Sequence, residues 1–133
     1  MGPRPMHLHV VTPGSVVVDA PADKVSTEAV DGSFTLLPRH IDMVAALVPG
    51  LLTYVLDGVE RLVAIDGGIL VKRDRSVRVA TGEAIPGDDA ADLQRALSAS
   101  MEDSRDAERR TRAALVHLET DAIRRLMELE DHD

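Results

Sequence analysis

Hydrophobic positions in the first two thirds of the chain form short runs, rich in Val, Leu and Ile, that alternate with turn signals. The dipeptides Pro13-Gly14, Asp57-Gly58 and Gly67-Gly68 are among the signals that separate the runs. Runs of this kind predict β-strands, and Asp57-Gly58 predicts a tight hairpin because glycine accepts the positive φ that the turn needs. The predicted strands cover residues 7–12, 15–19, 24–30, 33–37, 43–48, 51–57, 59–65, 69–73 and 76–81.

After Gly87 the hydrophobic pattern changes to helical spacing, and no glycine or proline follows that residue. Apolar residues recur every three or four positions in two sets, one for each of two predicted helices: Ala90, Leu93, Leu97 and Met101, then Leu115, Leu118, Ala122, Leu126 and Leu129. This spacing predicts helix, with Asp88 or Asp89 as its N-cap. The polar stretch 98–106 allows a turn but does not require one. The residues therefore allow either an antiparallel helical hairpin or one long helix.

The change at Gly87 predicts two domains, a β domain over residues 1–87 and a helical domain over residues 88–133. Many short strands at close spacing are typical of a sandwich or a barrel. No crossover helix interrupts the strands, which argues against a parallel α/β architecture. The predicted fold class is an all-β sandwich or barrel followed by helix.

Composition and charge exclude several function classes. Phe34 and Tyr54 are the only aromatic residues, which argues against binding single-stranded nucleic acid by stacking. The net charge of −8, most of it after Gly87, argues against contact with a phosphate backbone. The absence of cysteine excludes disulfides and thiolate metal sites. We therefore expect no nucleic-acid partner.

The longest apolar stretch without charge, residues 43–56, is too short to span a bilayer and contains Pro49-Gly50. We expect a cytosolic chain whose membrane contact, if any, comes through a partner.

Candidate chemistry along the chain is sparse. His7 and His9 share one face of a predicted strand, and with His40 they form a possible metal-ligand set, whereas a capped helix start explains the acidic cluster of Asp88, Asp89 and Asp92 without a metal. A small metal-binding β-barrel enzyme is therefore an alternative, but no adjacent Asp or Glu completes the ligand set. Neither a phosphate-binding loop nor a nucleophile elbow is present. We expect no metal and no catalytic residue.

Charged residues in the helical segment have two interpretations. Asp92 suits the positive end of a helix, and Asp92 with Arg95 forms an ordinary i,i+3 pair. Five arginines alternate with acidic residues: Arg109, Arg110, Arg112, Arg124 and Arg125. Such alternation is typical of a solvated helix face, but it also suits a surface that contacts anionic groups. A β-sandwich adaptor with a helical interaction tail is thus a second alternative.

The most specific stretch of the chain is Asp31-Gly-Ser-Phe-Thr-Leu-Leu-Pro-Arg-His40. An apolar run begins after a turn glycine and ends at a proline, followed by two basic residues. Proline at the end of a strand favours an edge or loop that faces solvent. The stretch predicts a shaped loop, either purely structural or a contact surface.

The order of these motifs resembles the epsilon subunit of F-type ATP synthase (delta in mitochondria) from Met6 onward. The opening His-Leu-His-Val-Val-Thr-Pro-Gly is similar to the family's first strand and turn. Gly32–His40, here named the signature loop, is similar to the family's Gly-x-Phe-Gly-Ile-Leu-Pro-x-His. Pro49-Gly50 and then Gly67-Gly68-Ile69-Leu70 follow in the family's order.

The resemblance implies a β-sandwich of about ten strands followed by a C-terminal α-helical hairpin. It implies a non-catalytic subunit of the central stalk that couples the gamma subunit to the c-ring. That subunit is peripheral, on the cytoplasmic face of the bacterial plasma membrane, and reaches the membrane only through the c-ring. Since the signature loop lies at the foot of the stalk, the implied gamma or c-ring contacts are Asp31, Ser33, Arg39 and His40.

The resemblance also implies a regulatory role for the helical tail. In bacterial members it switches between a hairpin folded on the β-sandwich and an extended form that reaches the catalytic alpha and beta subunits, and the extended form inhibits ATP hydrolysis. The five arginines are then the expected inhibitory contacts. Some relatives bind ATP through Ile/Leu-Asp-x-x-Arg-Ala, of which Asp92 and Arg95 remain here although Ala91 replaces the branched residue. Apart from this regulatory ATP, we expect no cofactor.

Two departures from the signature indicate a divergent rotor. Thr35 replaces the second glycine, and Asp42-Met43-Val44 replaces the usual Pro-Leu-Leu. A rotor of the secondary, sodium-type ATPase is the subclass that these departures suggest.

Overall fold

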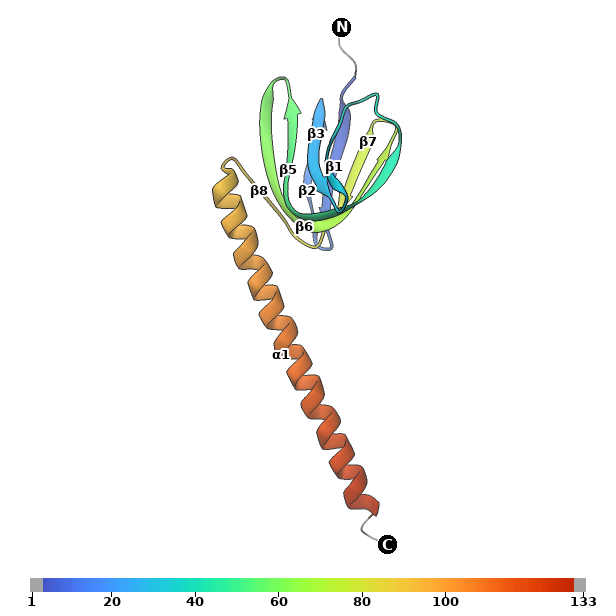
Figure 1. Cartoon of the computed structure of the whole chain (residues 1–133), viewed down its shortest axis with the longest axis vertical. Helices are drawn as coiled ribbons and strands as arrows, with labels where there is room; N and C mark the ends of the chain where they lie inside the picture. Colours follow the sequence, from blue (N-terminus) through green and yellow to red (C-terminus); the bar gives the residue numbers. More distant parts are fainter. Residues whose placement is uncertain (1–3, 131–133) are drawn as a thin grey trace. The chain divides into compact units, whose positions relative to one another are not determined.

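A computed structural model describes residues 4–130 of the chain. In this range it contains eight strands and one helix. They are β1 (Met6–Thr12), β2 (Ser15–Ala22), β3 (Lys24–Ala29), β4 (Gly32–Leu36), β5 (Met43–Leu56), β6 (Val59–Arg73), β7 (Ser76–Ala80), β8 (Ala84–Gly87) and α1 (Ala90–Glu130). The sheet order is β2-β1-β7-β6-β5-β3-β4, with β8 paired to β6. Figure 1 shows the strands curling into a β-sandwich, as the sequence predicts.

Strands β5 and β6 each join two of the predicted strands. They form one long antiparallel pair that runs from Met43 opposite Lys72 to Leu56 opposite Val59. The turn between them has φ of 51° at Asp57 and 77° at Gly58, which confirms the predicted hairpin. The described residues thus contain eight strands where the resemblance implied about ten.

The Pro49-Gly50 and Gly67-Gly68 dipeptides bend these long strands and do not end them. On one edge of β6, residues 62–65 pair with β8 and residues 69–73 pair with β7. On the far edge of β5, the pairing with β3 jumps from Ser26 opposite Thr53 to Ala29 opposite Leu47. At the bend β6 therefore changes its neighbour from β8 to β7, whereas β5 keeps β3 as its neighbour but shifts register. Strands shared in this way between two layers turn one sheet into a sandwich.

Gly68 lies against the backbone of Ala80, where the pairing of β6 with β7 begins. Its φ is +126°, and a Cβ added there would lie 2.0 Å from the carbonyl oxygen of Ala80. No L side chain fits in that space, and the backbone conformation itself favours glycine. The bend of β6 at Gly67-Gly68 therefore depends on a glycine at position 68.

The core is almost entirely aliphatic and follows the strand alternation. Its fully buried members include Leu8, Val10, Val25, Leu36, Leu52, Val63, Ile65, Leu70, Val77 and Val79. Burying a side chain of this size stabilises the fold by about 1.5–3 kcal/mol. Phe34 packs at the edge of this core and Tyr54 belongs to it. The near absence of aromatic residues thus leaves the packing of the β-sandwich intact.

Helix α1 begins at the predicted cap and continues without a turn. The Asp89 Oδ1 atom accepts a hydrogen bond from the Asp92 backbone N–H at 3.0 Å, which confirms Asp89 as N-cap. Residues 98–106 are helical throughout. The helical hairpin implied by the resemblance is therefore corrected to one continuous helix. No glycine or proline breaks this stretch, so each residue added to the helix gains a backbone hydrogen bond.

The chain divides into two compact units, one ending at Ser98 and one beginning at Ala99. In the first unit, Leu93 and Leu97 of α1 are buried, and Leu93 packs closely on Gly87. In the second, apolar residues of α1 such as Leu115 and Leu126 are exposed. The domain boundary at 87/88 stays a prediction.

We expect the Leu93→Ala/Leu97→Ala double variant to lower the free energy of unfolding of the first unit by about 2–5 kcal/mol, because two buried side chains are truncated. Leu118→Ala, at a 64% exposed position, is the control and should change it by less than about 0.5 kcal/mol. Urea titration followed by circular dichroism measures both. Equal effects would contradict the packing of the first helical turns on the β-sandwich.

Candidate functional site

The signature loop consists of β4 and the turn that follows it. The four contact residues implied by the resemblance are all exposed. Asp31 lies in the turn just before β4 and Ser33 is the second residue of that strand, whereas Arg39 and His40 lie in the turn beyond its end. Five strand residues extend about 17 Å. The structure therefore places these residues at two separate ends of one strand and does not bring all four together.

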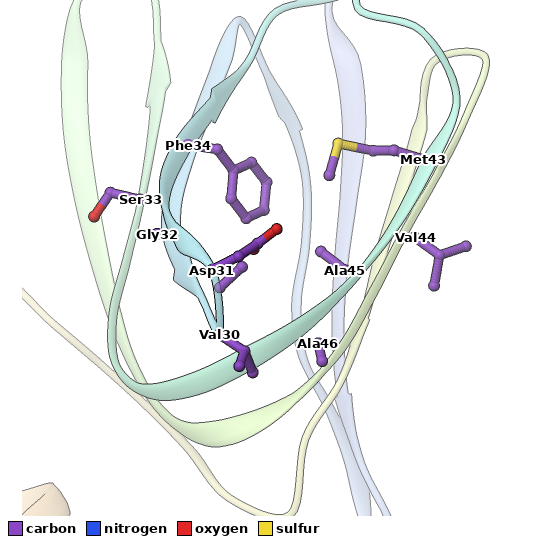
Figure 2. Close-up of a pocket in the computed structure, with 10 residues that line it drawn as sticks. Val30, Asp31, Gly32, Ser33, Phe34, Met43, Val44, Ala45 and Ala46 are labelled. Carbon is purple, nitrogen blue, oxygen red and sulfur yellow. The ribbon is translucent and has the colours of Figure 1, made fainter.

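The Asp31 and Ser33 end opens on a hollow between β4 and β5. Phe34 and Met43 line it from the two strands, together with Val30 and Val44. Figure 2 shows Phe34 and Met43 pointing inward, while Ser33 and Val44 point outward. This end of the loop thus has an apolar floor and a polar rim.

The Arg39 and His40 end is held by a buried lysine. Lys72 of β6 is only 2% exposed, and its ammonium donates hydrogen bonds to the carbonyl oxygens of His40 and Asp74, both at 2.5 Å. The Asp42 carboxylate accepts the Asp74 backbone N–H at 2.7 Å. Buried charges are costly unless they are hydrogen-bonded in this way. Lys72 therefore anchors the turn that presents Arg39 and His40.

Sequence reasoning did not single out Lys72. The available signal was the strand alternation, which turns Leu70 and Lys72 toward the core and Val71 toward solvent. A charged residue at an inward position needs buried partners, and the signature loop supplies one of them.

An apolar surface lies on the outward side of β5 and β6. Val44 pairs with Val71, and the neighbouring Ile69 pairs with Ala46. The backbone N–H of Val30 bonds the carbonyl oxygen of Ala46, which brings Val30 beside them. Val30 and Val44 are 73% and 71% exposed. Val30, Val44, Ile69 and Val71 are named here the apolar sheet face, and exposed aliphatic groups that adjoin one another are typical of interaction surfaces.

The predicted charged residues of α1 are all solvent-exposed. Arg95 forms an ion pair with Asp92, as expected for an i,i+3 contact. Arg109 lies 3.8 Å from the Asp106 carboxylate. The other four arginines of the predicted set are Arg110, Arg112, Arg124 and Arg125. ATP binding at Asp92 and Arg95 stays a prediction.

Among the described residues, no helix is both long and apolar enough to cross a bilayer.

The histidines of β1 gather with a residue that sequence reasoning missed. His7 hydrogen-bonds the Asp19 carboxylate, and His9 Nε2 lies 3.3 Å from the same oxygen. The hydrogen bond from His7, aided by the nearby charge of His9, lowers the pKa of Asp19. His40 does not join this cluster, and its Nδ1 bonds the neighbouring Ile41 carbonyl oxygen at 2.8 Å. In the set considered from the sequence, Asp19 therefore takes the place of His40 beside His7 and His9.

Comparison with known proteins identifies the family. Residues 5–87 match the family model described as the ATP synthase delta/epsilon chain, β-sandwich domain. The chain is 37% identical over 123 residues to the ATP synthase epsilon chain 2 of Cereibacter sphaeroides, covering 90% of this chain and 84% of that one. The chain belongs to the ATP synthase delta/epsilon family.

Other epsilon chains are similar over most of their length. The identity is 39% to the epsilon chain of Symbiobacterium thermophilum, over 80% of this chain and 74% of that one. The identity is 33% to the epsilon chain of Herpetosiphon aurantiacus, over 91% of this chain and 97% of that one. Because these similarities extend beyond the β-sandwich, the helical tail is part of the relationship to epsilon chains.

Solved structures support the same fold. A chain of the Euglena gracilis mitochondrial ATP synthase, solved as OSCP/F1/c-ring, superposes with a TM-score of 0.61 at 24% identity, covering 75% of this chain and 66% of that one. A chain of the Tetrahymena thermophila mitochondrial ATP synthase, solved as central stalk/c-ring, superposes with a TM-score of 0.52 at 13% identity. The match covers 62% of this chain and 66% of that one. At such identities the likeness concerns the fold.

Proposed function

We propose that this chain is the epsilon subunit of an F-type ATP synthase, a non-catalytic part of the rotor that joins the gamma subunit to the c-ring. The observation that carries the proposal is the family match over residues 5–87, extended into the tail by relatives named epsilon chains. Subunits of this kind transmit rotation through contacts and need no catalytic residues of their own.

The geometry supports two contact surfaces. The apolar sheet face suits a lasting contact, and we assign it to the gamma subunit because obligate interfaces are the more hydrophobic ones. The polar ends of the signature loop, Asp31 with Ser33 and Arg39 with His40, suit contacts with polar loops of the c-ring or gamma. The anchored turn over Lys72 keeps the second pair in place while torque passes through it.

The proposed location is the cytoplasmic face of the bacterial plasma membrane, where the chain would be peripheral and reach lipid only through the c-ring. The departures at Thr35 and Asp42 support a divergent rotor, such as that of the secondary sodium-type ATPase.

The tail is proposed to inhibit ATP hydrolysis by contact with the alpha and beta subunits. Its apolar residues Leu115, Leu118 and Leu126 are all more than half exposed, and a helix with such residues needs a partner to bury them. The five arginines, Arg109, Arg110, Arg112, Arg124 and Arg125, would then meet acidic surfaces of the catalytic subunits.

The test is ATP hydrolysis by the reconstituted complex. A chain ending at Ser98 should raise the hydrolysis rate by about fivefold or more, the lower end of typical allosteric coupling. Truncation at Ser98 is preferable to truncation at Gly87, because Leu93 and Leu97 then remain packed. Replacing all five arginines with glutamine should give part of the same increase.

The matched control is Glu108→Gln/Glu128→Gln, which changes charge on the same helix with the opposite sign and should not raise hydrolysis. Equal rates for all four chains would contradict inhibition by the tail. The rotor role is tested separately, since a chain that fails to co-purify with the gamma subunit would contradict it.

A further inference from the structure

His7, His9 and Asp19 converge on one point of the outer face of β1 and β2. Met6, Leu8 and Val10 are buried, so the two histidines between them face outward together. Asp19 lies directly opposite His9 in the β1–β2 pairing. Strand β1 is itself held between β2 and β7. The two histidines therefore stand on a strand that is paired on both sides, and Asp19 stands on β2, which pairs with it.

The three side chains lie close enough to share one metal ion, although His7 and Asp19 are in direct hydrogen-bond contact and would have to separate to admit it. One nitrogen from each imidazole and one carboxylate oxygen lie within 4.8 Å of one another. Ligands about 2.0–2.1 Å from a tetrahedral ion are themselves about 3.4 Å apart. The His9 Nε2 to Asp19 Oδ1 distance of 3.3 Å already has this value. A small rotation of the exposed His7 and Asp19 side chains would open the centre for an ion.

From this geometry we propose that His7, His9 and Asp19 bind one divalent transition-metal ion of the Zn²⁺ class. Two imidazole nitrogens and one carboxylate suit Zn²⁺, whereas Mg²⁺ and Ca²⁺ prefer oxygen ligands alone. Three protein ligands leave a position for water. The proposal concerns a surface that the rotor contacts proposed above do not use.

Two neighbouring groups set the expected strength of the site. His9 Nδ1 is buried and has no hydrogen-bond partner within the described residues, so the acceptor that usually orients a metal-bound histidine is missing. Arg78 of β7 pairs with His9, but its side chain is exposed and can turn its charge into solvent. We expect weaker binding than at a structural zinc site.

A bound ion would join β1 to β2 across the hairpin. Because the cluster exists in the folded chain, binding should raise the melting temperature in proportion to the logarithm of the metal concentration. Mg²⁺ at the same concentration should not raise it.

The test uses the purified full chain with ZnCl₂ in calorimetry and CoCl₂ in visible absorption. We expect one Zn²⁺ per chain at this site and Co²⁺ bands typical of four or five ligands. His9→Gln and Asp19→Asn should each weaken Zn²⁺ binding by more than about tenfold, since even outer partners of metal ligands have effects of that size. His117→Gln, which removes an imidazole from α1, is the matched control and should leave the affinity unchanged.

Circular dichroism of the metal-free variants verifies that they fold. The absence of saturable binding would overturn the proposal, as would equal affinity in folded His9→Gln and in the unmodified chain. Neither result bears on the hydrolysis and co-purification tests of the rotor role, because those need no metal at β1.

Discussion

Gly68→Ala is expected to lower the free energy of unfolding by roughly 2–6 kcal/mol, which combines backbone strain with overpacking at a closed corner. The added Cβ would lie 2.0 Å from the Ala80 carbonyl oxygen, and that oxygen belongs to backbone that cannot rotate away. The φ of +126° adds strain for any L residue. Strands β6 and β7 would have to separate where the sheet changes neighbours. Urea titration of the purified chain measures the loss.

The matched control for this change is Gly50→Ala in β5. A Cβ at Gly50 meets no atom within 4 Å, and its φ is outside the left-handed region. Alanine there should change stability by less than about 1 kcal/mol, with either sign. Similar losses of unfolding free energy at both glycines would mean that the close contact with Ala80 does not restrict position 68.

Lys72→Ala is expected to lower the free energy of unfolding by about 2–5 kcal/mol and to weaken binding to the gamma subunit and c-ring. The substitution leaves the carbonyl oxygens of His40 and Asp74 without their buried donor and creates a cavity. The turn carrying Arg39 and His40 should then loosen, although neither residue has been changed. Denaturant titration and a subunit binding assay measure the two effects.

Two further variants separate the causes. Lys72→Met restores volume but no donor, so it should recover part of the stability and little of the subunit binding. Arg73→Ala removes a charge from the exposed neighbouring position of β6 and should change stability by less than about 0.5 kcal/mol. Full subunit binding by a folded Lys72→Met variant would contradict an anchoring role for the lysine.

Local features of the fold could be predicted from the sequence because local forces determine them. Strand alternation, the Asp57-Gly58 turn and the Asp89 cap each depend on residues within a few positions of one another. The family could be predicted because its motifs occur in a fixed order along the chain. These predictions needed no knowledge of which strands pair.

The bends of β5 and β6 are features that local sequence signals did not predict. Gly67-Gly68 was predicted to end a strand, but the β5–β6 ladder continues past it. A glycine pair permits a turn and a bend equally, and the pairing of the neighbouring strands decides between them. Strand β8 was missed for a related reason, because Ala84–Gly87 is a strand only through its pairing with Leu62–Ile65 of β6.

By itself, the sequence determined the all-β first part, the helical second part, the signature loop and the family, since each depends on composition, spacing or motif order. Tertiary structure decided which distant side chains meet. A register shift between Val10 and Val11 places Asp19 opposite His9; without it Val18 would occupy that place. The inward side of β6 brings Lys72 beneath the turn at His40. Both contacts follow from how strands pair and in which register, which the hydrophobic pattern of each strand taken alone leaves open.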